Sequence, residues 1–132
     1  MTAQLSPSPK PLTVALAFAC DAALLLVFAG LGRSSHARDA SVWGLFETAW
    51  PFLAGLAIMW LVTRAHRRPL AVLRTGVPLW IGTVALGMAL RLLTGSGAAL
   101  AFVMVATITV AVFLLGWRAI AALVLRLRRR AG

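Results

Sequence analysis

LTVALAFACDAALLLVFAGL, residues 12–31, is an apolar run of twenty residues that contains one charged side chain, Asp21. At about 1.5 Å per residue, a helix of this length spans about 30 Å, the thickness of the hydrocarbon core of a bilayer. The run therefore predicts a membrane-spanning helix. A cleaved signal peptide is the alternative, but the single Lys10 before the run and Asp21 inside it favour a retained helix.

Three further apolar runs follow, at residues 41–62, 76–93 and 98–117. None of them alternates with period two, so they indicate helices and not the strands of a barrel. Because the connections are short, neighbouring helices are expected to be antiparallel. The sequence predicts an all-α fold, a polytopic transmembrane bundle of four antiparallel helices over residues 12–118.

The two ends of the chain differ from the apolar runs. Residues 1–11 are polar and contain three prolines, so we expect a disordered cytoplasmic arm. Residues 119–132 are expected to form a basic cytoplasmic helical tail that binds anionic lipid headgroups, at about 1 kcal/mol per charge. The charges of this tail are Arg126, Arg128, Arg129 and Arg130.

Composition excludes most soluble classes of protein. Hydrophobic residues make up 61% of the chain and charged residues 12%, whereas a soluble domain is about half apolar. The net charge of +10 would suggest nucleic acid in a soluble protein. Here the basic residues lie beside apolar runs, which is typical of membrane orientation signals, and we expect no nucleic-acid partner.

The positive charges predict the orientation of the bundle. With four spans, the N-terminus, the second connection and the C-terminus share one side of the membrane, and that side holds ten of the thirteen Lys and Arg residues. Arg33, Arg38 and Arg91 are on the other side. The side richer in Lys and Arg is normally cytoplasmic, so both termini are expected inside a multi-pass protein of the cell (inner or plasma) membrane.

Asp21 is the first candidate for a functional residue. It lies about 16 Å from the outer end of its helix, near the bilayer centre, where a charged carboxylate costs about 3 kcal/mol. Its neighbours on the same helix are apolar, so a polar partner must come from another helix. We expect that partner near Thr83, or near Thr107 and Thr109. A neutral acid bonded to a threonine or a backbone carbonyl is the alternative to a proton- or cation-binding site.

Glu47, Pro51 and Gly55 repeat at four-residue spacing, so they share one face of the second helix. Pro51 cannot donate a hydrogen bond to the carbonyl of Glu47, which predicts a kink. Thr83 and Gly87 form a similar thin face on the third helix, and such faces favour close packing of helices.

The outer end of the bundle holds a second group of candidates. Glu47 and Arg91 lie at similar depth and are expected to pair, with Arg33 and His36 of the first connection above them. A purely structural ion pair and a solvated histidine are the alternatives. His36 and Asp39 form too small a set to predict a metal site.

The other side chains give weaker signals. No motif for a catalytic site, a metal or a cofactor is present. Cys20 lies within an apolar run and indicates a small buried hydrophobe. The chain has no tyrosine, so its five tryptophans are expected to form the interfacial aromatic belt, with Trp43 and Trp60 near the two ends of the second helix.

Several strings resemble the domain-of-unknown-function family 3054, small four-helix membrane proteins of actinobacteria and haloarchaea. The resemblance extends from Asp21 to Arg118, and it implies location and topology but no activity. The strings are Asp21, GLGRSSH at 30–36, TAWPF at 48–52, Trp80, Thr83, Gly87, Met88, Arg91 and LGWR at 115–118.

These patterns favour a non-enzymatic membrane protein, a small transporter or channel-like unit with Asp21 as its membrane carboxylate. A homo-oligomer is expected if it conducts, because four short helices enclose little volume. One alternative is a structural or accessory subunit without transport activity. A second is an enzyme or binder that acts on anionic lipid or polyprenyl phosphate through Arg33, His36 and Arg91, with His36 or Glu47 moving protons.

Overall fold

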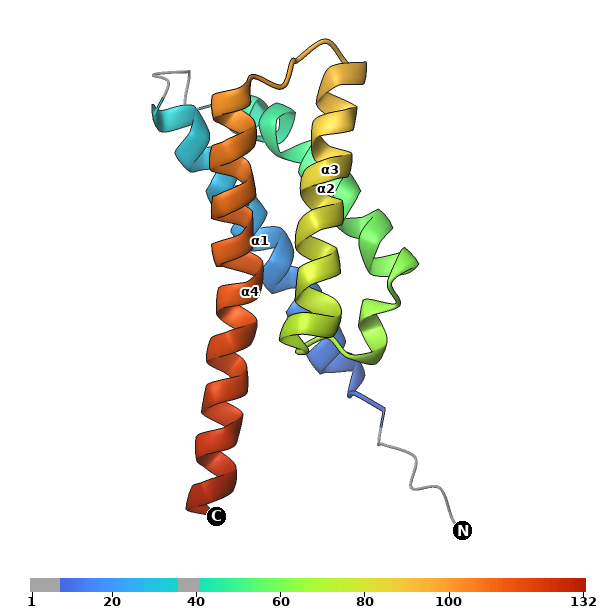
Figure 1. Ribbon diagram of the computed structural model, residues 1–132, viewed down its shortest axis with the longest axis vertical. Coiled ribbons are helices and arrows are strands. Elements are labelled where there is room, and N and C mark those ends of the chain that lie inside the picture. Colours follow the sequence, from blue (N-terminus) through green and yellow to red (C-terminus); the bar gives the residue numbers. More distant parts are fainter. Residues whose placement is uncertain (1–7, 36–40) are drawn as a thin grey trace.

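The computed structural model describes residues 8–35 and 41–132, with only the backbone described at residues 34 and 35. Its described part is helical and confirms the predicted four-helix bundle (Figure 1). Four helices are long and apolar enough to cross a membrane, the third of them together with the helical residues 72–76 that precede it. They are α1 (Pro11–Ser35), α2 (Val42–Val62), α3 (Val77–Leu93) and α4 (Leu100–Ala131).

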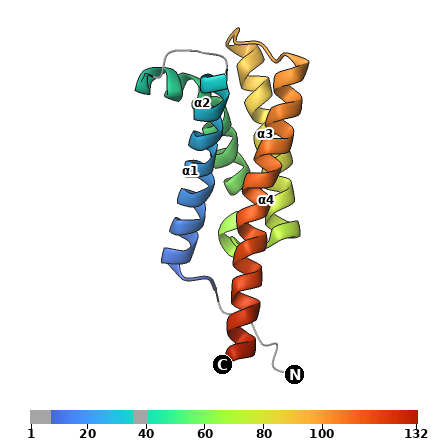
Figure 2. The same ribbon diagram turned by 90° about the vertical axis from the view of Figure 1, so that its left-hand side faces the viewer.

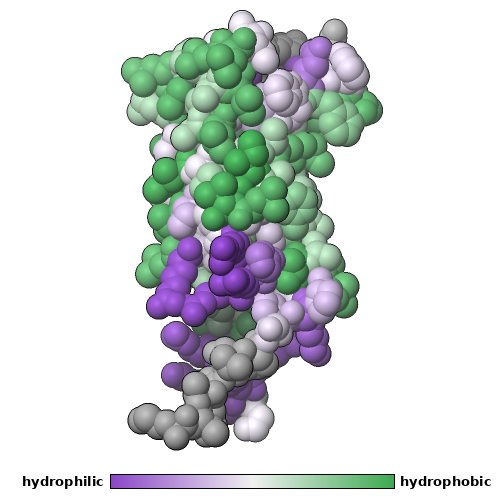
Figure 3. All heavy atoms as spheres, turned by 90° about the vertical axis from the view of Figure 1, so that its right-hand side faces the viewer, coloured by the Kyte–Doolittle hydropathy of each residue, from purple (hydrophilic) through white to green (hydrophobic). Residues whose placement is uncertain are grey.

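Successive helices run in opposite directions along the bundle (Figures 1 and 2). The start of α1, the connection between α2 and α3, and the end of α4 lie at one end, which we call the α2–α3 end. The α3–α4 connection lies at the opposite end, called the α3–α4 end. On one face of the molecule, hydrophilic residues gather at the α2–α3 end and apolar residues cover most of the remainder (Figure 3).

Helix α2 bends as the proline inside it predicts. The side chain of Ser41 caps its start by accepting a hydrogen bond from the Gly44 N–H at 3.0 Å. The first turns project sideways from the bundle, and the remainder runs along it (Figure 2). Pro51 is buried within the helix. A proline removes one backbone hydrogen bond and crowds the preceding turn, which accounts for the bend.

The thin faces of α2 and α3 pack against each other, as their small residues predict. A Cβ atom added at Gly55 would lie 3.1 Å from the Leu86 Cβ and 3.2 Å from the Thr83 carbonyl oxygen. At Gly87 an added Cβ would lie 2.5 Å from the ring of Phe52. The two glycines therefore permit an approach of the helices that larger residues would prevent.

The connection between α2 and α3 is folded and compact. It contains a 3-10 turn, Ala65–Arg67, and a π-helical turn, Val72–Gly76, that continues directly into α3. Arg64 adopts a left-handed backbone conformation with φ 53°, which allows the chain to reverse after α2. The Thr75 hydroxyl donates to the Arg68 carbonyl at 2.5 Å and closes the loop.

Helix α4 lies at the edge of the bundle and has the smallest buried share of the four spans. Its inner face contributes Ala106, Val110 and Leu114 to the core, and its outer face leaves many large apolar side chains exposed. The whole helix is 32 residues long without a break, well past the length that the hydrocarbon core requires.

Candidate functional site

Asp21 is the centre of a buried polar network. Its carboxylate is fully buried, and each oxygen accepts two hydrogen bonds. Oδ1 accepts from Arg118 Nη1 at 2.8 Å and from Trp117 Nε1 at 2.7 Å. Oδ2 accepts from Arg118 Nη2 at 2.7 Å and from Trp60 Nε1 at 3.0 Å. A carboxylate has about four acceptor positions, so these donors occupy them all.

Arg118 is the positive partner of Asp21 and is itself fully buried. Beyond its two bonds to the carboxylate, Nε donates to the Pro69 carbonyl at 2.9 Å and Nη1 to the Leu114 carbonyl at 3.0 Å. The guanidinium also lies 4.6 Å from the ring centroid of Trp117. Paired, planar contacts of this kind are the arrangement in which a buried Arg and a carboxylate are stable together.

Small residues and aromatic packing position these groups. A Cβ atom at Gly76 would lie 2.7 Å from the Leu115 Cδ2 and 3.4 Å from the Arg118 Cδ, so a glycine lets α4 approach the π-helical turn. The ring of Trp60 meets Phe18 edge to face, with centroids 5.3 Å apart. This contact orients the indole N–H toward Asp21.

The network lies nearer to the α2–α3 end than expected. Trp60 is two residues from the end of α2, and Pro69 belongs to the connection that follows. The expectation of a partner on another helix is confirmed, but the identity of that partner was wrong. None of the hydrogen bonds to the Asp21 carboxylate comes from Thr83, Thr107 or Thr109.

The threonines have other surroundings. The Thr107 hydroxyl donates to the Val103 carbonyl at 2.7 Å, and the Thr107 carbonyl accepts from Trp80 Nε1 at 2.8 Å. Thr83 is fully buried at the contact between α2 and α3, and its hydroxyl has no hydrogen-bond partner in the structure. Burial of an unpaired hydroxyl costs free energy, so Thr83 does not stabilise the bundle through its oxygen.

The predicted pair of Glu47 and Arg91 does not form. Glu47 is exposed on the projecting part of α2 and accepts from Trp43 Nε1 at 2.9 Å. Arg91 instead donates to the Gly97 carbonyl at 3.0 Å and lies 4.4 Å above the ring of Phe102. The bend of α2 turns Glu47 outward, while Arg91 holds the connection between α3 and α4.

The rest of the expected outer cluster is also divided. Arg33 Nη1 donates to the Thr48 hydroxyl at 3.1 Å and its guanidinium lies over Gly44. His36 and Asp39 lie outside the described residues. Within the described ranges, no group of three or more His, Cys, Asp or Glu residues could hold a metal ion.

The sequence did not predict three residues of the network as site residues: Trp60, Trp117 and Arg118. Arg118 was counted as an orientation charge, and Trp60 was assigned to the interfacial belt. Trp60 is buried, whereas Trp43 is exposed as a belt residue would be. One signal was available for Arg118, because the apolar run continues beyond it through residues 119–125 and places it within a membrane-length segment.

Comparison with known proteins supports the resemblance found in the sequence. The family model described as "Protein of unknown function (DUF3054)" matches residues 18–121. That range includes Asp21, Trp60, Trp117 and Arg118, so it covers the side chains of the buried network. No curated protein and no solved structure matches the chain. The chain, which has four helices long and apolar enough to cross a membrane, belongs to the DUF3054 family of proteins of unknown function.

Proposed function

We propose that this protein is a structural or accessory membrane subunit, in which Asp21 and Arg118 fix the arrangement of the helices. The observation that carries the proposal is the saturation of the Asp21 carboxylate by four donors while its side chain is fully buried. We therefore favour a structural role over that of a transporter that binds ions at Asp21.

The contacts support a role in packing. Asp21 belongs to α1, Trp60 to α2, and Trp117 with Arg118 to α4, so one carboxylate joins three helices. Arg118 also binds the connection through the Pro69 carbonyl. Removal of either Asp21 or Arg118 should destabilise the protein by about 3–5 kcal/mol, because the other charge would remain buried and unpaired.

The same contacts give little support to ion binding at Asp21. A cation would need an open carboxylate lone pair and a path to it, whereas the four acceptor positions are filled and Arg118 already neutralises the charge. Transport through this residue would require Arg118 to leave, at the free-energy cost of a broken buried pair.

An enzyme or binder for anionic lipid or polyprenyl phosphate receives less support at the α3–α4 end. Arg33 binds the Thr48 hydroxyl, and Arg91 binds the backbone carbonyls of residues 96 and 97. Among the described residues, the two guanidinium groups thus bind different elements of the bundle. A phosphate site would need them to converge on one anion.

Flux measurements test the proposal. Purified protein and the Asp21→Asn variant would be reconstituted at matched density into proteoliposomes with pH- and cation-sensitive dyes inside. We expect both to match protein-free vesicles, and we expect Asp21→Asn to unfold at a lower temperature in detergent. Glu47→Gln is the matched control, because that carboxylate is exposed and its neutralisation should change neither the flux nor the unfolding temperature.

A different outcome of the same measurements would reject the proposal. Flux by the wild-type protein that disappears in Asp21→Asn, while Glu47→Gln retains it and all three proteins are equally stable, would reject the structural role. It would establish Asp21 as a transport residue.

A further inference from the structure

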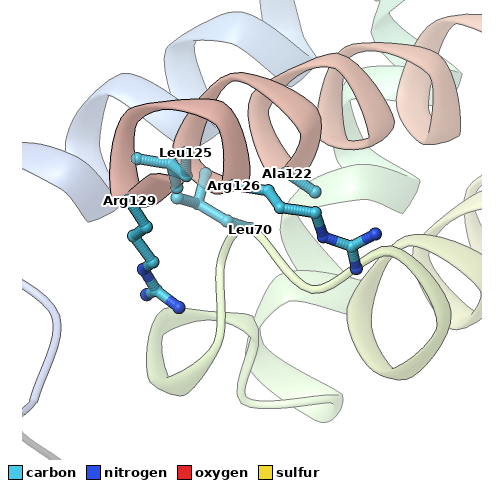
Figure 4. A pocket seen from close by; sticks show the side chains of 5 residues that line it. All are labelled: Leu70, Ala122, Leu125, Arg126 and Arg129. Carbon is cyan, nitrogen blue, oxygen red and sulfur yellow. The ribbon is translucent and has the colours of Figure 1, made fainter. Parts of the chain in front are cut away.

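A hollow on the surface lies between the last turns of α4 and the α2–α3 connection (Figure 4). Its volume is about 280 Å³, close to the lower end of the range for small-molecule sites, which begins near about 300 Å³. Both guanidinium groups lie on the side of α4 that faces the connection. The hollow is lined by Leu70, Ala122, Leu125, Arg126 and Arg129.

The spacing along α4 separates these arginines from the other two of the tail. Positions 122, 125, 126 and 129 lie on one face of a helix, at intervals of three and four residues. Arg128 and Arg130 carry the same charge in the same turns but do not line the hollow. The chain therefore contains two pairs of arginines that differ in position and not in charge.

The charges of the hollow are not neutralised within the described part of the protein. Neither Arg126 nor Arg129 has a hydrogen bond or an ion pair to another described residue. The chain has only three acidic side chains. Asp21 is bound to Arg118, and Glu47 lies near the start of α2, at the opposite end from Arg126; Asp39 is outside the described residues.

The depth of the hollow matches that of lipid headgroups. If Leu100 lies at one boundary of the hydrocarbon core, about 30 Å of helix ends near Ile120. Arg126 is then about 39 Å from Leu100 and about 9 Å beyond the core boundary, so its long side chain can reach back into a headgroup layer that is about 5–8 Å thick on each side. Ala122 lies about 3 Å and Leu125 about 8 Å beyond the same boundary, so the hollow extends across the headgroup layer from the level where acyl chains begin.

We propose that this hollow binds an anionic glycerophospholipid. Arg126 and Arg129 bind its phosphate, since guanidinium groups form paired, charge-assisted hydrogen bonds with phosphate oxygens. Leu70, Ala122 and Leu125 contact the first methylene groups of an acyl chain. The inference is independent of the role proposed for Asp21, because none of these residues belongs to the buried network.

Native mass spectrometry of the detergent-solubilised full-length protein tests the proposal, with equal amounts of phosphatidylglycerol and phosphatidylcholine. We expect a wild-type adduct with phosphatidylglycerol. Arg126→Gln/Arg129→Gln should weaken that adduct at least about tenfold, whereas Arg128→Gln/Arg130→Gln should change it less than about threefold. Ala122→Trp, which fills the hollow and keeps all charges, should weaken it as well.

Three results would overturn the proposal. Equal loss in the two double variants would mean that only the total charge of the tail attracts lipid. Equal binding of phosphatidylcholine would remove the preference for an anionic headgroup. Displacement of the lipid by excess inorganic phosphate would identify free phosphate, and not a phospholipid, as the ligand.

Discussion

Arg118 and Asp21 are 97 positions apart in the chain, yet their side chains meet at two points, at 2.8 and 2.7 Å, and neither is exposed to solvent. Two indole N–H groups complete the coordination of the carboxylate. The ion pair therefore connects the first and last helices of the bundle. Its contribution to folding can be separated from any other role by substitution.

Replacement of Arg118 by Met should destabilise the protein by about 3–5 kcal/mol, because it leaves a buried carboxylate without its cation. The free energy of unfolding would be measured in mixed micelles by titration with SDS. The double variant Asp21→Leu/Arg118→Met should regain much of this loss, since it buries no charge. Wild-type stability of Arg118→Met would show that the pair does not hold the bundle together.

Trp60→Phe and Trp117→Phe keep an aromatic ring but remove the N–H that binds Asp21. Loss of one hydrogen bond to a charged group costs about 1.5–3 kcal/mol, so each variant should unfold at lower SDS fraction. Trp43→Phe is the control, because its N–H donates to the exposed Glu47. An equal effect of all three substitutions would assign the loss to ring size and not to the hydrogen bond.

Gly87→Ala should separate α2 from α3, because the new Cβ would lie 2.5 Å from the ring of Phe52. Overpacking of this kind costs about 1–3 kcal/mol. Gly116→Ala has nothing within 4 Å of the added atom, and should be neutral or slightly stabilising through its higher helix propensity. Thermal unfolding in detergent checks both, and equal unfolding temperatures would contradict the close packing at Gly87.

Thr83→Val tests whether the buried hydroxyl has a functional partner. The hydroxyl has no hydrogen bond in the structure, so its replacement by a methyl group should leave stability unchanged or raise it by about 1–2 kcal/mol. Thr75→Val is the control, since that hydroxyl donates to the Arg68 carbonyl and its loss should destabilise. A clear loss of stability in Thr83→Val would mean that the hydroxyl binds a group absent from the bundle itself.

The orientation predicted from the positive charges can be tested with single cysteines in a Cys20→Ser background. A cysteine in place of Ser96, in the α3–α4 connection, should react with an impermeant maleimide on intact cells. A cysteine in place of Arg67, in the α2–α3 connection, should react only after the cells are permeabilised. The reverse pattern of labelling would place the α2–α3 end outside the cell and the α3–α4 end inside.

The sequence by itself determined the four helices, their antiparallel order and the bend in α2. Apolar length, short connections and a proline act locally, so they can be read from neighbouring residues. The thin faces at Gly55 and Gly87 were likewise readable, because small residues at four-residue spacing share one side of a helix.

Tertiary structure alone decided which polar groups meet. Glu47 and Arg91 have similar depths, but the direction of the α2 bend and the capping of the α3–α4 connection assign them different partners. Asp21 required a donor from another helix, and its depth in the membrane did not identify which helix supplies that donor. The rotation of α4 about its axis, which places Arg118 inward, depends on packing contacts with Gly76 and Pro69 that are distant in the sequence.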